Sequence, residues 1–270
     1  PGASPMAASE RTSFLYHASA LALSGHITRP LNHLIEVQAG TTLPTTGGHG
    51  SARVENFRFD TMVSFKAGYS LVSGSEKIKG DKVIHTTLSQ AVLEGLNILD
   101  VVTADRIVAR LASSYEPGSQ EPRIVLIGSK FENLCIAGCK INVDLDHEWA
   151  LKLDTFEATR KEFETNQEFR KMAEDPFAPV TLPARVEPHG IICCSIVKEV
   201  KPAKCPGITS HGHHGHVLAV PEFGKIFLGE VVFQHGCKTL TMLRVDLGSP
   251  SNGGVTAGQA NSNGRPPGGP

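Results

Sequence analysis

The chain has 270 residues, of which 40% are hydrophobic and 20% are charged, and its formal net charge is −1 because 26 basic residues face 27 acidic ones. This balance is typical of a soluble globular protein and gives no net field that would attract nucleic acid or an anionic membrane. No run of the chain approaches the roughly 18 apolar residues of a spanning helix, so we expect no membrane span.

The two ends of the sequence are poor in apolar residues and rich in glycine, proline, serine and asparagine. Segments of this composition bury too little apolar surface to fold alone. We therefore predict an N-terminal arm over residues 1–10, a single β-rich domain over 11–247 and a Gly/Pro/Asn-rich tail over 248–270. Extended tails of this kind can join subunits by pairing with the open edge of a neighbouring sheet.

Between these ends most of the chain reads as strands separated by turns, since 27 glycines and 17 prolines interrupt short apolar runs. Residues 11–28 are apolar on both parities, as in a strand that is buried on both faces. Further strands are predicted over 33–37, 54–59, 62–73, 82–88, 106–113, 123–129, 131–136 and 141–145.

The period of the sequence changes after this series of strands. Residues 147–175 carry an apolar stripe at helical spacing, which begins at Trp149 and ends at Met172. Asp146 can cap the start and Pro176 can stop the helix. The predicted fold class is therefore mainly β, an antiparallel sandwich or barrel with one long amphipathic α-helix over about residues 147–175.

Strands resume at 190–200 and 216–220, and residues 225–233 and 238–247 predict a hairpin. In the second arm of this hairpin, simple alternation places one set of side chains on a common face. That set is Thr239, Thr241, Leu243, Val245 and Leu247.

Six cysteines are too few for a chain of this length to depend on a disulfide framework, which favours a reducing compartment such as the cytoplasm. No clear signal peptide is present. Cys193 and Cys194 are adjacent in an apolar run, so they should point to opposite faces of a strand and should not bridge each other.

The strongest cluster of chemically capable side chains is a histidine-rich turn. It contains His211, His213, His214 and His216. Imidazole nitrogen is a ligand for Zn, Ni or Cu, and residues two apart share a face of an extended chain. A further ligand would have to come from Cys205, His189, His235 or Cys237. The competing interpretation is a surface turn rich in histidine and glycine.

Nucleophile-elbow, phosphate-loop and zinc-protease motifs do not occur in the sequence. The first functional hypothesis is therefore a non-catalytic, self-assembling structural or scaffold protein whose partners are copies of itself, joined through its tails or sheet edges. The second is a metal-dependent enzyme of the cupin-like β-barrel type that uses the cluster of residues 211–216. The third is a small-ligand binding module, with a pocket between the sheet and the helix at 146–175.

Overall fold

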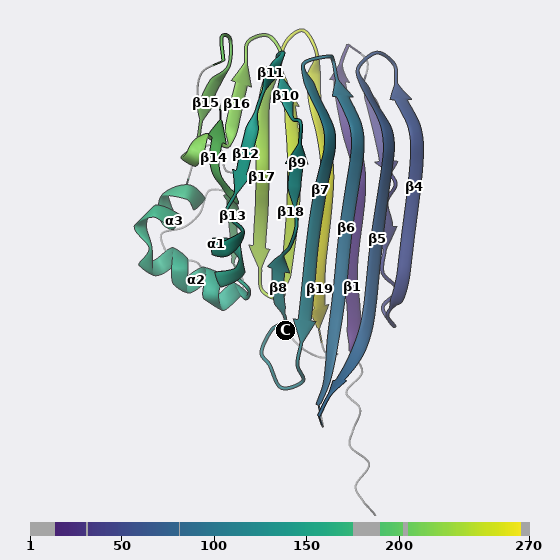
Figure 1. Cartoon of the computed structure of the whole chain (residues 1–270), viewed down its shortest axis with the longest axis vertical. Coiled ribbons are helices and arrows are strands. Elements are labelled where there is room, and N and C mark those ends of the chain that lie inside the picture. The colour runs from purple at the N-terminus through teal and green to yellow at the C-terminus, as the bar shows by residue number, and fades with distance from the viewer. Residues whose placement is uncertain (1–13, 31, 81, 175–189, 202–204, 266–270) are drawn as a thin grey trace, which may run out of the picture.

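The computed structural model describes residues 14–30, 32–80, 82–174, 190–201 and 205–265. These residues form two large antiparallel sheets that lie face to face (Figure 1). The sheets do not close into a barrel, since β2 and β4 end them on one side. The mainly β, antiparallel prediction is confirmed, and the barrel alternative is not.

The first sheet has nine strands. Along its path lie β15 (Thr209–His211), β16 (Val217–Val220), β17 (Gly224–Gln234), β18 (Cys237–Leu247), β19 (Asn252–Arg265), β1 (Leu15–Arg29) and β2 (His33–Gln38), while β13 (Ile191–Ser195) pairs with β17 and β3 (Thr41–Thr42) with β1. The predicted hairpin is confirmed as β17 and β18, which pair from Gly224↔Leu247 to Gln234↔Cys237.

The second sheet has eight strands. Its path runs through β11 (Cys139–Lys140), β10 (Cys135–Ile136), β7 (Val102–Tyr115), β6 (Lys82–Ile98), β5 (Val63–Lys79) and β4 (Gly48–Phe59), while β8 (Arg123–Leu126) and β9 (Lys130–Glu132) pair with β7. A separate pair is formed by β12 (Asn142–Leu145) and β14 (Val197–Lys201).

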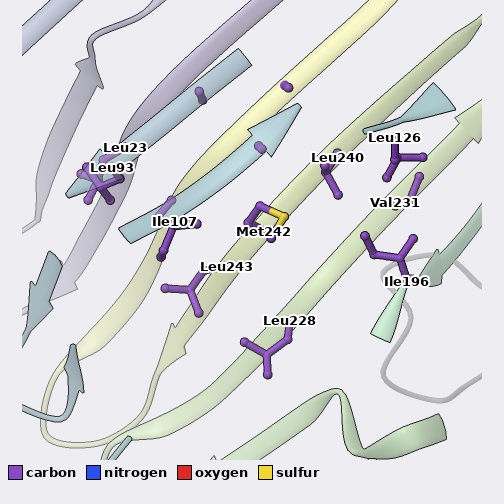
Figure 2. Packing of buried hydrophobic residues seen from close by; sticks show 14 of the residues in the cluster. Leu23, Leu93, Ile107, Leu126, Ile196, Leu228, Val231, Leu240, Met242 and Leu243 are labelled. Carbon is purple, nitrogen blue, oxygen red and sulfur yellow. The ribbon is translucent and has the colours of Figure 1, made fainter. Parts of the chain in front are cut away.

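The hydrophobic core fills the space between the two sheets (Figure 2). Leu93 and Ile107 come from the eight-stranded sheet, and Leu23, Leu240 and Met242 from the nine-stranded sheet; all five side chains are inaccessible to solvent. Burying each such side chain stabilises the fold by about 1.5–3 kcal/mol before the entropy of ordering is subtracted.

The prediction of one long amphipathic helix is wrong, because three short helices replace it: α1 (His147–Lys152), α2 (Phe156–Thr165) and α3 (Gln167–Ala173). Thr155 and Asn166 are extended residues whose side-chain oxygens accept backbone N–H groups of the helix that follows. These caps compete with a continuous helix and restart it twice. The apolar stripe itself is real, since Phe163 and Phe169 are buried.

Most of the segment predicted as a C-terminal tail forms strand β19 inside the nine-stranded sheet. It pairs with β18 on one side and with β1 on the other, where Leu15↔Arg265 and Leu23↔Ala257 are partners. Val255, Ala257 and Ala260 are buried. This part of the tail is therefore held by its own chain. The predicted arm over 1–10 lies outside the described residues.

A disulfide joins Cys139, the first residue of β11, to Cys205, with their Cα atoms 6.3 Å apart. This pairing was not predicted, because the two cysteines are separated by 66 positions in the chain. Cys193 and Cys194 are both free, as expected from their vicinal position in β13. In the part of the chain that the structure describes, no helix is long and apolar enough to cross a membrane.

Candidate ligand-binding site on the outer face of the large sheet

A hollow of about 220 Å³ lies on the outer face of the nine-stranded sheet, beside helix α3. We call it the α3 hollow. It is lined by Met172, Cys193, Cys194, His216, Glu230, Val231, Val232, Thr241, Arg244, Thr256 and Gln259. A hollow with an apolar wall and several convergent polar groups is the usual form of a small-ligand site.

The polar floor of the α3 hollow comes from two rows of residues that run across neighbouring strands. Glu230, Thr241 and Gln259 form one row, and Phe227, Arg244 and Thr256 form the next. In the first row Gln259 Nε2 donates to Thr241 Oγ1 at 3.2 Å.

Both rows face outward because the alternation of inward and outward side chains is interrupted between them. On β18, Thr241 lines the hollow whereas Met242 and Leu243 are both buried, so the predicted common face of residues 239–247 is wrong. Gly258 on β19 has φ +65°, and a Cβ on it would lie 3.0 Å from Ile107 of the facing sheet. Glycine therefore permits both the change of face and the close approach of the sheets.

Arg244 is the fixed cationic centre of the site. Its guanidinium donates to both Glu230 oxygens at 2.8 Å and to Asp246 Oδ2 at 2.7 Å. Its Cζ lies 3.6 Å from the ring centroid of Phe227. Burial works against the charge, but the hydrogen bonds and ion pairs with the two carboxylates outweigh it and raise the pKa of Arg244. The side chain is therefore oriented before any ligand arrives.

Two buried side chains in the lining of the α3 hollow, His216 and Cys193, carry groups that can bind protons or accept hydrogen bonds. His216 is 6% exposed, and its Nδ1 lies 2.9 Å from the carbonyl oxygen of His213. In the tautomer that donates this bond, Nε2 is an acceptor. Cys193 is 2% exposed, and burial, together with the charge of Glu230, raises the pKa of its thiol to about 11. The thiol is thus protonated near neutral pH and is a poor nucleophile.

A second, more open hollow of about 460 Å³ adjoins the first and shares Arg244 and Thr256 with it. We call it the β2 hollow, because Leu34 and Val37 of β2 form its apolar wall. A Cβ on Gly254 would meet nothing closer than 3.6 Å. The fold does not require glycine at this position, and its absent side chain leaves the floor of the β2 hollow clear.

The structure spreads the histidine cluster over a turn. His211 ends β15, where its Nε2 lies 3.1 Å from Thr209 Oγ1, and the rings of His213 and His214 are 4.2 Å apart in the 3-10 turn η1 (His213–Gly215). Among the described residues, no group of three or more His, Cys, Asp or Glu side chains is arranged to hold a metal ion. Of this cluster, only His216 lines the α3 hollow.

The four additional metal ligands proposed from the sequence do not line the α3 hollow in the part of the chain that the structure describes. Cys205 is bonded to Cys139. His235 and Cys237 lie at the hairpin turn between β17 and β18, and His189 lies outside the described residues.

Apart from His216, none of the residues that line the α3 hollow was predicted as a site residue from the sequence. Arg244 and Glu230 stand 14 positions apart, and the hairpin register places Glu230 opposite Thr241 and Arg244 opposite Phe227. Register and strict alternation would put the two charges on opposite faces, so the pair could not be predicted without the change of face between Thr241 and Arg244.

Comparison with known proteins adds one family. The model of the family described as Domain of unknown function (DUF8256) matches residues 14–178 and 159–234. No curated protein matches the chain. No solved structure matches it either.

Proposed function

We propose that the chain, which belongs to the DUF8256 family of unknown function, is a small-ligand binding module whose ligand occupies the α3 hollow. The observation that carries this proposal is the convergence of His216, Glu230, Thr241, Arg244 and Gln259 on one recess beside α3. This is the third of the hypotheses drawn from the sequence, with the pocket between the sheet and the helical segment.

A hollow that was only a packing gap beside a helix would be lined by apolar side chains. Here an oriented guanidinium, a histidine and a glutamine–threonine pair line the same space. Burying such groups costs free energy unless they are paired, so their convergence on one hollow favours a role in recognition. At about 220 Å³ the hollow suits a ligand smaller than a typical drug molecule.

Self-assembly remains a prediction, but the observation that motivated it has another explanation. Residues 252–265, inside the predicted tail, are paired with β1 and β18 of the same chain. Light scattering coupled to size exclusion tests self-assembly directly, and a dimer or larger species at micromolar concentration would support it.

The binding proposal is tested by an NMR screen with amines, carboxylic acids, alcohols and amides of up to about ten heavy atoms. We expect hits that shift the backbone amides of β18 and β19 around Thr241 and Gln259. Thr256→Leu places a larger side chain between the two hollows and should abolish these shifts.

The matched control is Thr103→Leu, the same change at a half-buried position between the core residues Val102 and Ala104 of β7 in the other sheet. It should leave the hits unchanged. The proposal is overturned if no compound shifts these amides, or if the two variants weaken binding equally.

A further inference from the structure

From the charges and hydrogen-bond acceptors around Arg244 we infer that the ligand of this site carries an ammonium group. This inference rests on the proposed function and names the chemical class of its ligand. It draws on two separate observations, the surplus of carboxylates around the joined hollows and an acceptor nitrogen of a buried histidine.

The carboxylates outnumber the cations. Glu36, Glu230 and Asp246 line the two hollows, and Arg244 is the one Lys or Arg side chain among the residues that line them. Two of these carboxylates are paired with Arg244. Three negative charges and one positive charge leave the two hollows with a net charge of −2. Such a recess attracts a cation and repels an anion, most strongly where water is excluded.

The uncharged groups of the α3 hollow point to the same chemistry. In the tautomer of His216 whose Nδ1–H donates to the carbonyl of His213, Nε2 is an acceptor in a ring that is 6% exposed and lines the hollow. The described contacts of His216 include no partner for this nitrogen. Gln259 donates its amide N–H to Thr241, which leaves Gln259 Oε1 as a further acceptor.

A ligand that fills the hollow must therefore supply donors. An ammonium has three N–H donors and no acceptor, whereas a carboxylate has acceptors only. The apolar side chains of Met172, Val231 and Val232 in the lining suit a short alkyl chain attached to that ammonium. We therefore expect a small primary amine with an aliphatic body.

The test compares three probes of nearly equal shape, n-butylammonium, n-butanol and n-butyrate, titrated at pH 7 and followed by amide shifts in β18 and β19. We expect n-butylammonium to bind at least about tenfold more tightly than n-butyrate, with n-butanol between them. Its affinity should fall as salt is added.

One charge variant and its control test whether the preference for n-butylammonium arises at this site. Asp246→Asn removes a half-exposed carboxylate from the site and should weaken n-butylammonium several-fold more than it weakens n-butanol. The matched control is Glu55→Gln, which removes an exposed carboxylate from β4 of the other sheet and should change neither affinity.

The outcomes separate this inference from the proposed function. Equal affinities for the three probes, tighter binding of n-butyrate, or a wider screen whose tightest hits are not amines would overturn the ammonium inference and leave the binding module standing. If no compound of any class shifts the amides of β18 and β19, the binding module is refuted and the inference falls with it.

Discussion

Arg244 combines two roles, since the side chain that orients the candidate site also links strands β17 and β18. It lies on β18, and its partner Glu230 on β17 has a side chain that is only 14% exposed. The guanidinium covers the ring of Phe227. Removing the arginine leaves a largely buried carboxylate without its counter-charge.

We therefore expect Arg244→Met to lower the free energy of unfolding by about 2–4 kcal/mol. Urea denaturation monitored by circular dichroism measures the change. Arg53→Met is the matched control, because Arg53 pairs with Glu55 at the surface and both side chains are more than half exposed. Its loss should cost less than about 1 kcal/mol. Equal effects of the two substitutions would contradict this account of Arg244.

Lys238 is a buried cation whose charge the fold disfavours. Its side chain is 2% exposed, and its Nζ donates to the backbone carbonyls of Ile124, at 2.5 Å, and Leu153. Burial lowers its pKa from 10.5 to about 7, against the opposing attraction of Asp154, Glu121 and Cys194. Between pH 7 and pH 10.5 the unfolded chain thus holds a proton that the folded chain has released.

Stability rises with pH wherever the unfolded state binds more protons, so Lys238 makes the fold more stable as pH increases from 7. Relative to Lys238→Met, the unfolding free energy of the wild-type chain should gain about 2 kcal/mol between pH 7 and pH 9. Urea denaturation of both proteins at the two pH values measures this gain. Parallel pH profiles of the two proteins would contradict this prediction, because they would show that folding does not lower the pKa of Lys238.

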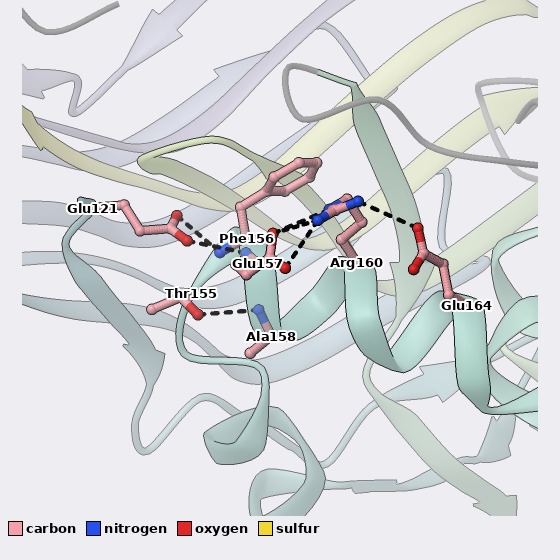
Figure 3. A network of polar contacts seen from close by, with 7 residues as sticks. All are labelled: Glu121, Thr155, Phe156, Glu157, Ala158, Arg160 and Glu164. Atoms are coloured by element: carbon pink, nitrogen blue, oxygen red, sulfur yellow. Dashed lines mark hydrogen bonds and ion pairs between the residues drawn. The ribbon is translucent and has the colours of Figure 1, made fainter.

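At the scale of elements, helix α2 depends on a carboxylate from outside the helix (Figure 3). Glu121, in the loop between β7 and β8, accepts the backbone N–H groups of Phe156 and Glu157, each at 2.9 Å. Thr155 accepts that of Ala158. A helix of 10 residues is marginal by itself, so these contacts decide whether its first turn forms.

Glu121→Ala should therefore destabilise the protein by about 1–2 kcal/mol and speed hydrogen exchange at the amides of Phe156 and Glu157. Hydrogen-exchange NMR reads those two amides directly. Glu116→Ala, in the same loop but paired with Lys82 at the surface, is the control and should change neither quantity appreciably. Unchanged exchange in Glu121→Ala would mean that Thr155 alone caps α2.

The elements differ in how far the sequence predicts them. Apolar periodicity is sufficient for the hairpin β17–β18 and for the buried stripe of the helices. It does not reveal the breaks at Thr155 and Asn166, because an N-cap is a local hydrogen bond that leaves the apolar spacing intact.

Strand β19 is missed for a different reason. Hydrogen bonding to a strand on each side stabilises it, and small residues such as Ala257 and Gly258 suit the narrow space below Ile107. A composition rich in glycine and asparagine therefore hides a central strand. The candidate site is missed for the same reason, since Thr256 and Gln259 lie on β19 and come to lie opposite Arg244 and Thr241 only after the sheet has formed.

At the scale of the whole molecule, the disulfide between Cys139 and Cys205 closes a loop that contains β12, the three helices, β13 and β14. It therefore ties the segment that bears the helices to β11 of the eight-stranded sheet. In the chain-entropy model a loop of 66 residues is worth about 4 kcal/mol of stability.

The double variant Cys139→Ser/Cys205→Ser should melt roughly 10 °C below the wild-type protein, as should the wild-type protein in reductant. Calorimetric scans with and without dithiothreitol measure the shift. Cys135→Ser, which changes a free and half-buried cysteine on β10, is the control and should melt close to the wild type. If reductant has no effect on the wild type, the bond does not stabilise the fold.

The pairing of β1 with β19 also governs how the protein is made. During translation β1 emerges from the ribosome some 240 residues before its long partner, so one edge of it stays unsatisfied while the intervening strands are synthesised. The nine-stranded sheet can be completed only after residue 265 has left the exit tunnel. A nascent chain that stalls earlier exposes a long apolar edge, which makes it a target for chaperones and proteases.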